Sequence, residues 1–192
     1  MTAEYLTAVG SIGTFVVIAA TAVAAVIQLR HMRAGNQLTG LLNVLARIED
    51  PESSGWFEDA KDQISKNMSD PAYRRAILEG TFSRRDNAWA NLCNSYEWTG
   101  SLVKHDLIPE EPFMDVYSAR LLAAWDLVEE IVAIRRRRGD PSLWENFEYL
   151  VVRARAWERA NPDGAYPANV ERLKIADKWL AADNAASSAT AN

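Results

Sequence analysis

The chain opens with a long apolar run that has no charged residue between Glu4 and Arg30. These 25 residues are mostly Ala, Val, Ile, Leu and Phe, with Thr, Gly, Ser and one Gln among them. Because a helix rises about 1.5 Å per residue, about 20 apolar residues cross the roughly 30 Å hydrocarbon core of a bilayer. A core helix of a small soluble domain is rarely apolar on every side over such a length. The run therefore predicts a transmembrane helix.

A cleaved secretory signal is the main alternative for this run. Such a signal has a basic N-terminal region, a short apolar region and a cleavage site of small residues. Residues 22–24 match that site weakly, but residues 1–4 contain no Lys or Arg, so an anchor is favoured. Arg30 and Arg33 follow the run, and cytoplasmic flanks are enriched in Lys and Arg. We therefore expect a single-pass anchor with its N-terminus outside and residues 30–192 in the cytoplasm.

Small and polar residues of the run fall on one stripe of the predicted helix. They recur in steps of three and four, the spacing of a heptad seam, and the same phase continues through Leu38 and Leu42. Small residues on one stripe let helices approach closely in lipid, so the stripe is a candidate surface for a homo-oligomer. The alternative is that such residues are simply common in membrane helices. The candidate self-association residues are Thr7, Gly10, Thr14, Thr21 and Ala24.

Beyond the anchor, apolar residues recur at helical spacing, and no segment alternates like a strand. Asp precedes Pro at 50–51, 70–71 and 140–141, and each pair suits an N-cap followed by the first helical residue. The chain is therefore predicted to be all-α, with one N-terminal transmembrane helix followed by a cytoplasmic bundle of five or six helices.

This pattern divides the chain into three parts. Residues 1–33 are expected to form the anchor and its basic flank, 34–183 the cytoplasmic helical domain, and 184–192 a disordered tail of small and polar residues. Within the domain, the predicted helices are a continuation of the anchor to about 49, then 51 to the mid-sixties, a short helix after Pro71, 83–104, 111–138, one after Pro141, and 169–182.

Composition and motifs exclude several functional classes. A net charge of −5 and a pI near 5.1 give no overall electrostatic footprint for nucleic acid, which is not an expected partner. One cysteine, Cys93, and two histidines, His31 and His105, leave no spacing that suits a zinc site. Neither a glycine-rich phosphate loop nor a nucleophile elbow occurs. We therefore expect no cofactor and no metal, and we identify no catalytic residue.

Two acidic residues are expected to be partly buried. Glu97 borders the apolar stripe of its helix, and Glu148 follows Phe147 on another. A buried carboxylate needs a partner or becomes protonated, and Arg120 and Arg135 on the neighbouring helix are candidate partners. Buried ion pairs that fix helix register are the favoured interpretation of these four residues. An acidic ligand-binding pocket is the alternative.

Residues 135–138 form the only dense basic run. The favoured interpretation is that their charge complements the dipole at the end of a predicted helix. Contact with anionic lipid headgroups is the alternative, and nucleic acid is a weaker third because of the negative net charge. The candidate lipid contacts, with the flank of the anchor included, are Arg30, Arg33, Arg135, Arg136, Arg137 and Arg138.

A set of spaced residues in the second half of the chain carries a family pattern. Its pieces are Tyr96-Glu97, Gly100, Leu102-Val103, Trp125, Arg135, Gly139-Asp140-Pro141, Trp144 and Phe147-Glu148. This pattern resembles the DUF4760 family, bacterial proteins of unknown function, and the membrane helix that runs into "QLRHMRAGNQLTGLLNVLARIEDPE" is also similar. The resemblance implies a helical, membrane-tethered protein and no reaction. With the orientation given above, the expected location is the bacterial inner membrane.

Together these features favour a membrane-tethered cytoplasmic module for interaction or scaffolding. Its expected partners are the lipid bilayer, a protein of unknown identity and, through the stripe of small residues, a second copy of the chain. The alternative is a membrane-anchored ligand-binding sensor or an enzyme that uses buried carboxylate and arginine groups. A polar cluster inside a concave pocket would favour the alternative, whereas an apolar patch on the outside would favour the module.

Overall fold

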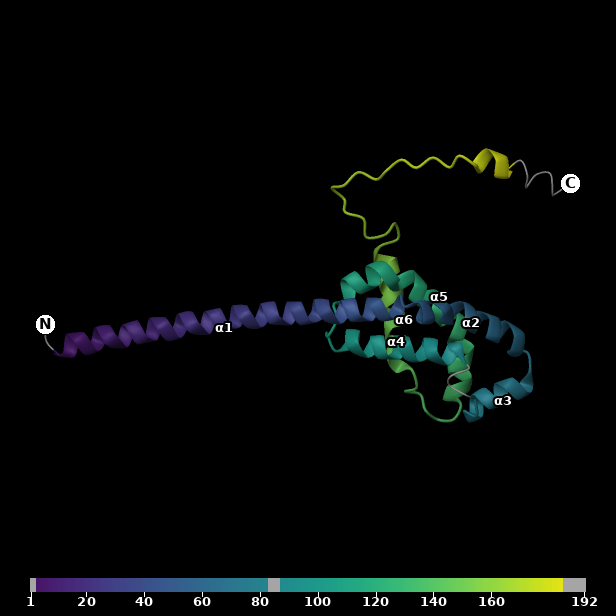
Figure 1. The fold of residues 1–192 in the computed structure, drawn as a ribbon, viewed down its shortest axis with the longest axis horizontal. Coiled ribbons are helices and arrows are strands. Elements are labelled where there is room, and N and C mark those ends of the chain that lie inside the picture. The colour runs from purple at the N-terminus through teal and green to yellow at the C-terminus, as the bar shows by residue number, and fades with distance from the viewer. Residues whose placement is uncertain (1–2, 83–86, 185–192) are drawn as a thin grey trace. The chain divides into compact units, whose positions relative to one another are not determined.

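The computed structural model describes residues 3–82 and 87–184, and every regular element in these ranges is a helix. The predicted all-α class, with a long apolar helix at the N-terminus and a bundle after it, is confirmed. Figure 1 shows the helices in chain order. They are α1 (Ala3–Ile48), α2 (Pro51–Asn67), α3 (Pro71–Glu79), α4 (Ala88–Lys104), α5 (Glu110–Arg136) and α6 (Glu145–Ala160).

α1 is one unbroken helix of 46 residues. Its described side chains are exposed as far as Asn36, and this part extends beyond the other helices (Figure 1). Among the described helices, α1 alone is long and apolar enough to cross a membrane, a property that signal sequences share. The last turns differ, because Leu41, Val44 and Ile48 are buried in the protein core. One rigid element therefore joins an exposed apolar segment to the folded helices.

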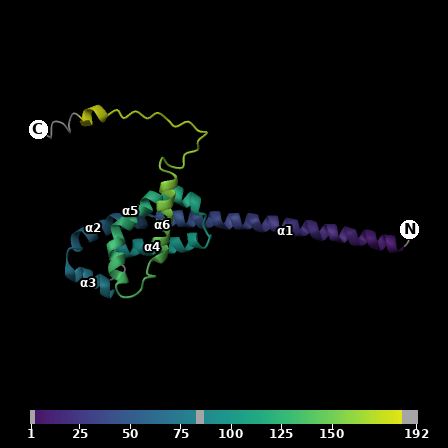
Figure 2. The same ribbon diagram turned by 180° about the vertical axis from the view of Figure 1, so that it is seen from behind.

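The folded helices α2 to α6 enclose a single core. α6 packs against both α4 and α5, while α2 packs on α4 and α3 on α5. In both views α3 lies at the end of this body remote from the N-terminal part of α1 (Figures 1 and 2). Large side chains with almost no exposure fill the interior, among them Trp89, Phe113, Leu121, Ile131, Phe147 and Leu150.

Two of the three Asp-Pro pairs begin helices as predicted, and the third does not. α2 starts at Pro51 and α3 at Pro71, where the Asp70 carboxylate accepts a hydrogen bond of 2.8 Å from the backbone N–H of Ala72. After Pro141, by contrast, residues 141–144 form a turn and α6 begins only at Glu145. The turn ends at Trp144, which has the left-handed φ of 58°. The local capping signal was therefore overridden by contacts from elsewhere in the chain.

The described residues from 163 to 184 belong to a second structural unit, whereas α1 to α6 belong to the first. The predicted helix at 169–182 is wrong: residues 171–177 are extended, and helical structure occurs only at 180–184. All described side chains from 163 to 184 are exposed. An isolated helix of this length is marginal in water, so a segment that buries no apolar face has little to hold it helical. Residues 185–192, most of the predicted disordered tail, lie outside the described part of the chain.

Candidate functional site

Glu97 of α4 holds the N-terminus of α6. Its carboxylate accepts hydrogen bonds of 3.0 Å from the backbone N–H groups of Asn146 and Phe147, and one of 2.7 Å from the Asn146 side chain. The first N–H groups of a helix have no partner within that helix, and the positive end of the helix dipole attracts an anion. Trp144, at the N-cap position, makes no side-chain hydrogen bond to the first N–H groups of α6. Glu97 thus supplies from α4 the cap that the local sequence of α6 lacks.

This partner differs from the arginine expected for Glu97. Among the described residues, no ion pair joins Glu97 to Arg120 or Arg135. Arg120 is half-buried on α5, where burial raises the pKa of nearby Tyr96 and the Arg120 guanidinium acts to lower it. The charge of Glu97 is therefore met by backbone dipoles rather than by a cation.

Gly100, one turn after Glu97, lets α4 and α6 approach closely. A Cβ atom at this position would lie 2.6 Å from the carbonyl carbon of Asn146 and 3.0 Å from its Cβ. Backbone atoms cannot yield as the end of a flexible side chain can, so any larger residue forces the two helices apart. The spacing between Glu97 and Gly100 thus combines a cap with a close contact on one face of α4.

Aromatic rings surround this helix contact. The rings of Tyr96 and Phe147 are stacked with centroids 4.9 Å apart, and Trp125 meets Phe147 edge-on at 5.1 Å. Trp144 lies edge-on to Trp89 at 6.3 Å and donates its indole N–H to the Asn94 side chain at 3.0 Å. Both arrangements are favoured by the ring quadrupole. Several residues of the family pattern, among them Tyr96, Glu97, Gly100 and Phe147, thus lie at the contact between α4 and α6.

The basic residues that close α5 also have internal partners. Arg135 donates to the carbonyls of Ile77 and Leu78, at 3.1 and 3.4 Å, and Arg138 donates to that of Glu79 at 2.7 Å. These contacts satisfy carbonyl groups at the C-terminus of α3. The two side chains therefore tie α3 to α5. Lipid contact by residues 135–138 stays a prediction.

Glu148 forms an ion pair with Arg136, a neighbour of the expected partner Arg135. Their charged groups are 2.7 Å apart, and the Arg136 Nε donates to the carbonyl of Leu143 at 3.0 Å. Glu148 is exposed, so the pair is partly solvated rather than buried. Through these two contacts, Arg136 joins the end of α5 to the first turn of α6 and to the turn that precedes it. Exposed pairs of this kind contribute about 0–1 kcal/mol.

Cys93 is fully buried on α4, on the face that carries Trp89 and Tyr96. Burial raises the pKa of its thiol far above the ordinary value. A nucleophilic cysteine needs the thiolate, which this environment disfavours. The geometry therefore supports a packing role for Cys93.

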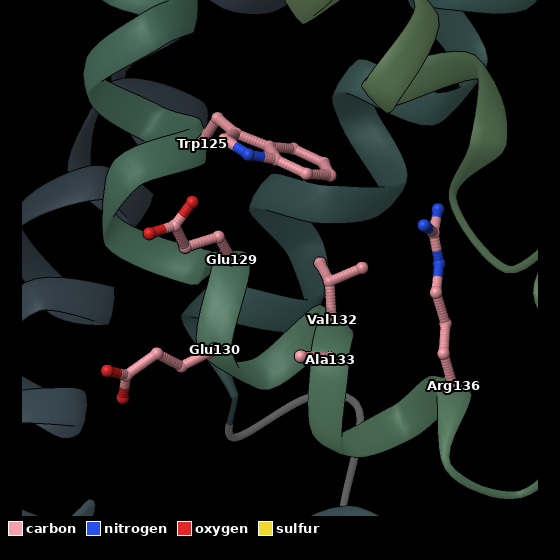
Figure 3. Close-up of a pocket in the computed structure, with 6 residues that line it drawn as sticks. All are labelled: Trp125, Glu129, Glu130, Val132, Ala133 and Arg136. Atoms are coloured by element: carbon pink, nitrogen blue, oxygen red, sulfur yellow. The ribbon is translucent and has the colours of Figure 1, made fainter.

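A surface pocket of about 360 Å³ lies beside Trp125 on α5. Figure 3 shows that the Glu129 and Glu130 side chains project to one side of the helix and that Arg136 rises on the other. Val132 and Ala133 lie between them. An acid–base or binding constellation needs polar groups that converge on one point. In this pocket the charged groups diverge, and Arg136 is already paired with Glu148.

The stripe of small residues on α1 is exposed where the structure describes its side chains. The hydroxyls of Thr7, Thr14 and Thr21 each donate to a backbone carbonyl four residues earlier, at 2.8–3.0 Å. Their polarity is thus satisfied within the helix, as a lipid environment requires. A Cβ atom added at Gly10 would have no neighbour within 4 Å, and Ala24 is exposed as well. The structure contains a single chain, so association stays a prediction.

Sequence reasoning missed a site where α1 meets the connection between α4 and α5. Arg33 forms an ion pair with Asp106, and the Gln37 side chain donates to the Asp106 carbonyl at 3.0 Å. Arg30 is exposed three residues before Arg33. The turn at Asp106 has a left-handed φ of 57°. Asp adopts this conformation more often than most residues but still uncommonly, so its presence alone is a weak sequence signal.

Comparison with known proteins supplies a family and no activity. The family described as "Domain of unknown function (DUF4760)" matches residues 15–154, which span most of α1 and most of the helical body. No curated protein and no solved structure matches the chain. Within the described residues, no group of three or more His, Cys, Asp or Glu side chains is placed to hold a metal ion.

Proposed function

Because this chain belongs to the DUF4760 family, whose description assigns no activity, we propose its function from geometry: a cytoplasmic helical module for interaction, tethered to the membrane by α1. The observation that carries the proposal is the continuity of α1. The same helix is apolar and exposed over its first part and then contributes Leu41, Val44 and Ile48 to the core. An exposed apolar helix is stable in a bilayer, and its rigid continuation would hold the body close to the surface.

Charge supports the orientation. Arg30 and Arg33 lie on the body side of the apolar segment, and cytoplasmic flanks carry such an excess of basic residues. The proposed location is the inner membrane of a bacterium, with one crossing, the N-terminus outside and the helical body in the cytoplasm.

Membrane extraction and protease protection test the tether. The full chain is expressed with an epitope at each end, and the membrane fraction is washed with alkaline carbonate. We expect both epitopes to stay in the pellet. In spheroplasts, external protease is expected to remove the N-terminal epitope alone. Recovery of a soluble chain shortened near residue 24 would instead identify the apolar segment as a cleaved signal.

A second copy of the chain is the partner that a specific observation favours. Leu38 and Leu42 continue the phase of the α1 stripe beyond the proposed membrane segment, and both are exposed. Copies inserted in one orientation present this stripe to one another in parallel and in the same register. The seam would therefore run from Thr7 through Gly10 to Leu42.

Cysteine crosslinking tests this association. Leu42→Cys is expected to form a disulfide-linked dimer in oxidised membranes, because equivalent seam positions meet in a parallel pair. Thr39→Cys is the matched control, exposed on the same turn of α1 but off the seam phase. Native Cys93 is buried and should not react. Equal crosslinking of both variants would indicate random collision and contradict the seam.

The alternative, a ligand-binding sensor or an enzyme, has less support. It requires carboxylate and arginine groups that meet in a pocket. Glu97 is engaged by the N-terminus of α6, Arg135 by the end of α3, and Arg136 by Glu148. Three of the four charged residues proposed for such chemistry, Glu97, Arg135 and Glu148, are thus engaged in joining helices, which supports the interaction module.

A further inference from the structure

A pocket of about 440 Å³ lies between the middle of α1 and the helical body. One wall comes from α1, and the other comes from the connection between α4 and α5. We call it the junction pocket. Its lining residues are Leu29, Met32, Arg33, Asn36, Gln37, His105, Asp106 and Leu107.

The connection that forms one wall is fixed against α1. Asp106 is held by the Arg33 ion pair and by Gln37, and Ile108 is buried beneath it. At Gly40 of α1, an added Cβ atom would lie 3.1 Å from Ile108 Cγ2 and 3.2 Å from the Leu107 carbonyl oxygen. The close approach at Gly40 therefore sets the position of Leu107 beside α1.

Three apolar side chains of the pocket are exposed to an unusual degree for a folded protein. Leu29, Met32 and Leu107 are 64%, 63% and 55% exposed. Leu29 and Met32 are neighbours on one face of α1, and Leu107 joins them from a loop more than 70 positions later in the sequence. Exposed apolar side chains that gather at one place mark a surface that is covered in use.

The height of the pocket matches the headgroup layer of a bilayer. Arg30 is the first charged residue after the apolar run and marks its end. From Leu29 to Gln37, α1 rises about 12 Å, which covers a headgroup layer of about 5–8 Å. Leu29 would then lie at the edge of the hydrocarbon, with Asn36 and Gln37 at the water side.

The charges around the pocket suit an anion. Arg33 and His105 line it beside Asp106, and Arg30 directly follows the lining residue Leu29 on α1. A guanidinium has five N–H donors, so Arg33 keeps free donors beside its pair with Asp106.

We propose that the junction pocket binds an anionic phospholipid of the cytoplasmic leaflet, and this inference rests on the proposed membrane tether. Arg33 and His105 donate hydrogen bonds to the phosphate oxygens, as cations and ring N–H groups do at phosphate sites. Leu29, Met32 and Leu107 contact the first carbons of the acyl chains. The lipid thereby fixes the rotation of the body on the membrane, with the connection between α4 and α5 facing the bilayer.

Depth-dependent quenching tests the position of the loop. The full chain with Leu107→Cys is labelled with an environment-sensitive dye and reconstituted into vesicles whose lipids carry a quencher near the headgroup. We expect strong quenching at position 107. The control is Thr81→Cys, an exposed position two residues after α3. α3 lies at the end of the body remote from the N-terminal part of α1 (Figures 1 and 2). Equal quenching at the two positions would overturn the proposal.

Lipid retention tests the charge preference. The full chain is purified in mild detergent with phosphatidylglycerol and phosphatidylcholine in equal amounts, and bound lipid is counted by native mass spectrometry. Arg33→Gln is expected to lower phosphatidylglycerol retention about fivefold, the factor that corresponds to one basic residue near an anionic surface. Arg75→Gln, an exposed arginine on α3, is the matched control and should have no effect. An equal loss in both variants, or equal retention of the two lipids by the native chain, would contradict the proposal.

Vesicle flotation at alkaline pH separates this inference from the tether on which it rests. A chain that leaves the vesicles under these conditions refutes the tether itself. A chain that stays bound, but shows no quenching at position 107, refutes only the junction pocket. Leu107→Cys and Arg33→Gln are at exposed positions and should leave the fold intact.

Discussion

α6 and the segment 169–182 are both short stretches whose apolar residues recur at helical spacing. In α6, Phe147, Leu150, Val151 and Ala154 are buried against α4 and α5. In the later segment, Leu173 and Trp179 are exposed and residues 171–177 are extended. The two segments have similar apolar patterns, but only α6 has other helices to pack against.

α6 is stabilised by contacts with α4. Glu97 binds its first free N–H groups, and Gly100 leaves room for its backbone. Most of the stability of a helix in a protein comes from such packing and capping rather than from propensity. The comparison teaches that an amphipathic pattern forms a stable helix where a partner surface exists to receive it.

The largest effect should come from closing the space at Gly100. In Gly100→Ala, the added Cβ overlaps the backbone of Asn146, and we expect the free energy of unfolding to fall by about 3 kcal/mol. Urea unfolding of the full chain in detergent micelles, followed by tryptophan fluorescence, measures the change. Gly13→Ala is the control, since a Cβ there has no neighbour within 4 Å. Matching midpoints for the two variants would show that the close contact does not decide the docking of α6.

Removing the cap should cost somewhat less. Glu97→Ala leaves the N–H groups of Asn146 and Phe147 without their acceptor, which destabilises the fold by about 2 kcal/mol. Glu97→Gln keeps one acceptor oxygen and should lose about half as much. The same unfolding assay measures both. If Glu97→Ala has the same urea midpoint as the native chain, then α6 does not depend on the Glu97 cap for its stability.

A tyrosine from each region sharpens the comparison further. Tyr117 in the body donates a 2.8 Å hydrogen bond to Glu49, whereas Tyr166 in the later unit is exposed. Tyr117→Phe should lower the free energy of unfolding by about 1 kcal/mol, and Tyr166→Phe should leave it unchanged. An equal loss in both variants would remove this distinction between the regions.

The pH dependence of Tyr117 follows from the same contact. Burial and the hydrogen bond to Glu49 raise the pKa of the Tyr117 phenol from 10.0 to about 12. Since the folded state holds the proton more tightly, this stabilisation is complete below pH 10 and is lost as the pH rises through about 12. The stability difference between the native chain and Tyr117→Phe should shrink over that interval, measured as urea midpoints in a pH series. A constant difference would contradict the assignment.

The smallest effect should come from removing residues 163–192. Every described side chain from 163 to 184 is exposed, so deletion should change the free energy of unfolding of the remaining chain by less than about 0.5 kcal/mol. The urea midpoint of the shortened chain measures this. A large loss would mean that the later unit contributes packing to the body, and the contrast with α6 would fail.

The local pattern was sufficient where a helix is long or carries its own cap. The all-α class, the length of α1 and the starts of α2 and α3 at Pro51 and Pro71 follow from apolar spacing and from Asp before Pro. The start of α6 was misplaced, because its cap comes from Glu97, 48 positions before the first residue of α6 at Glu145. Burial of Glu97 beside an apolar stripe was foreseeable, but its partner was not.

The sequence by itself determined the helical character of this chain, its apolar first segment and the family pattern that spaces Glu97, Gly100 and Phe147. The first two depend on residues near one another along the chain, and the family pattern is a matter of residue order and spacing alone. Only the tertiary structure decided that Glu97 caps α6, that the side chains of segment 169–182 stay exposed, and that Leu107 and Leu29 line one pocket. The physical reason is that caps, close contacts and pockets arise between distant segments, and their formation depends on how the whole core packs.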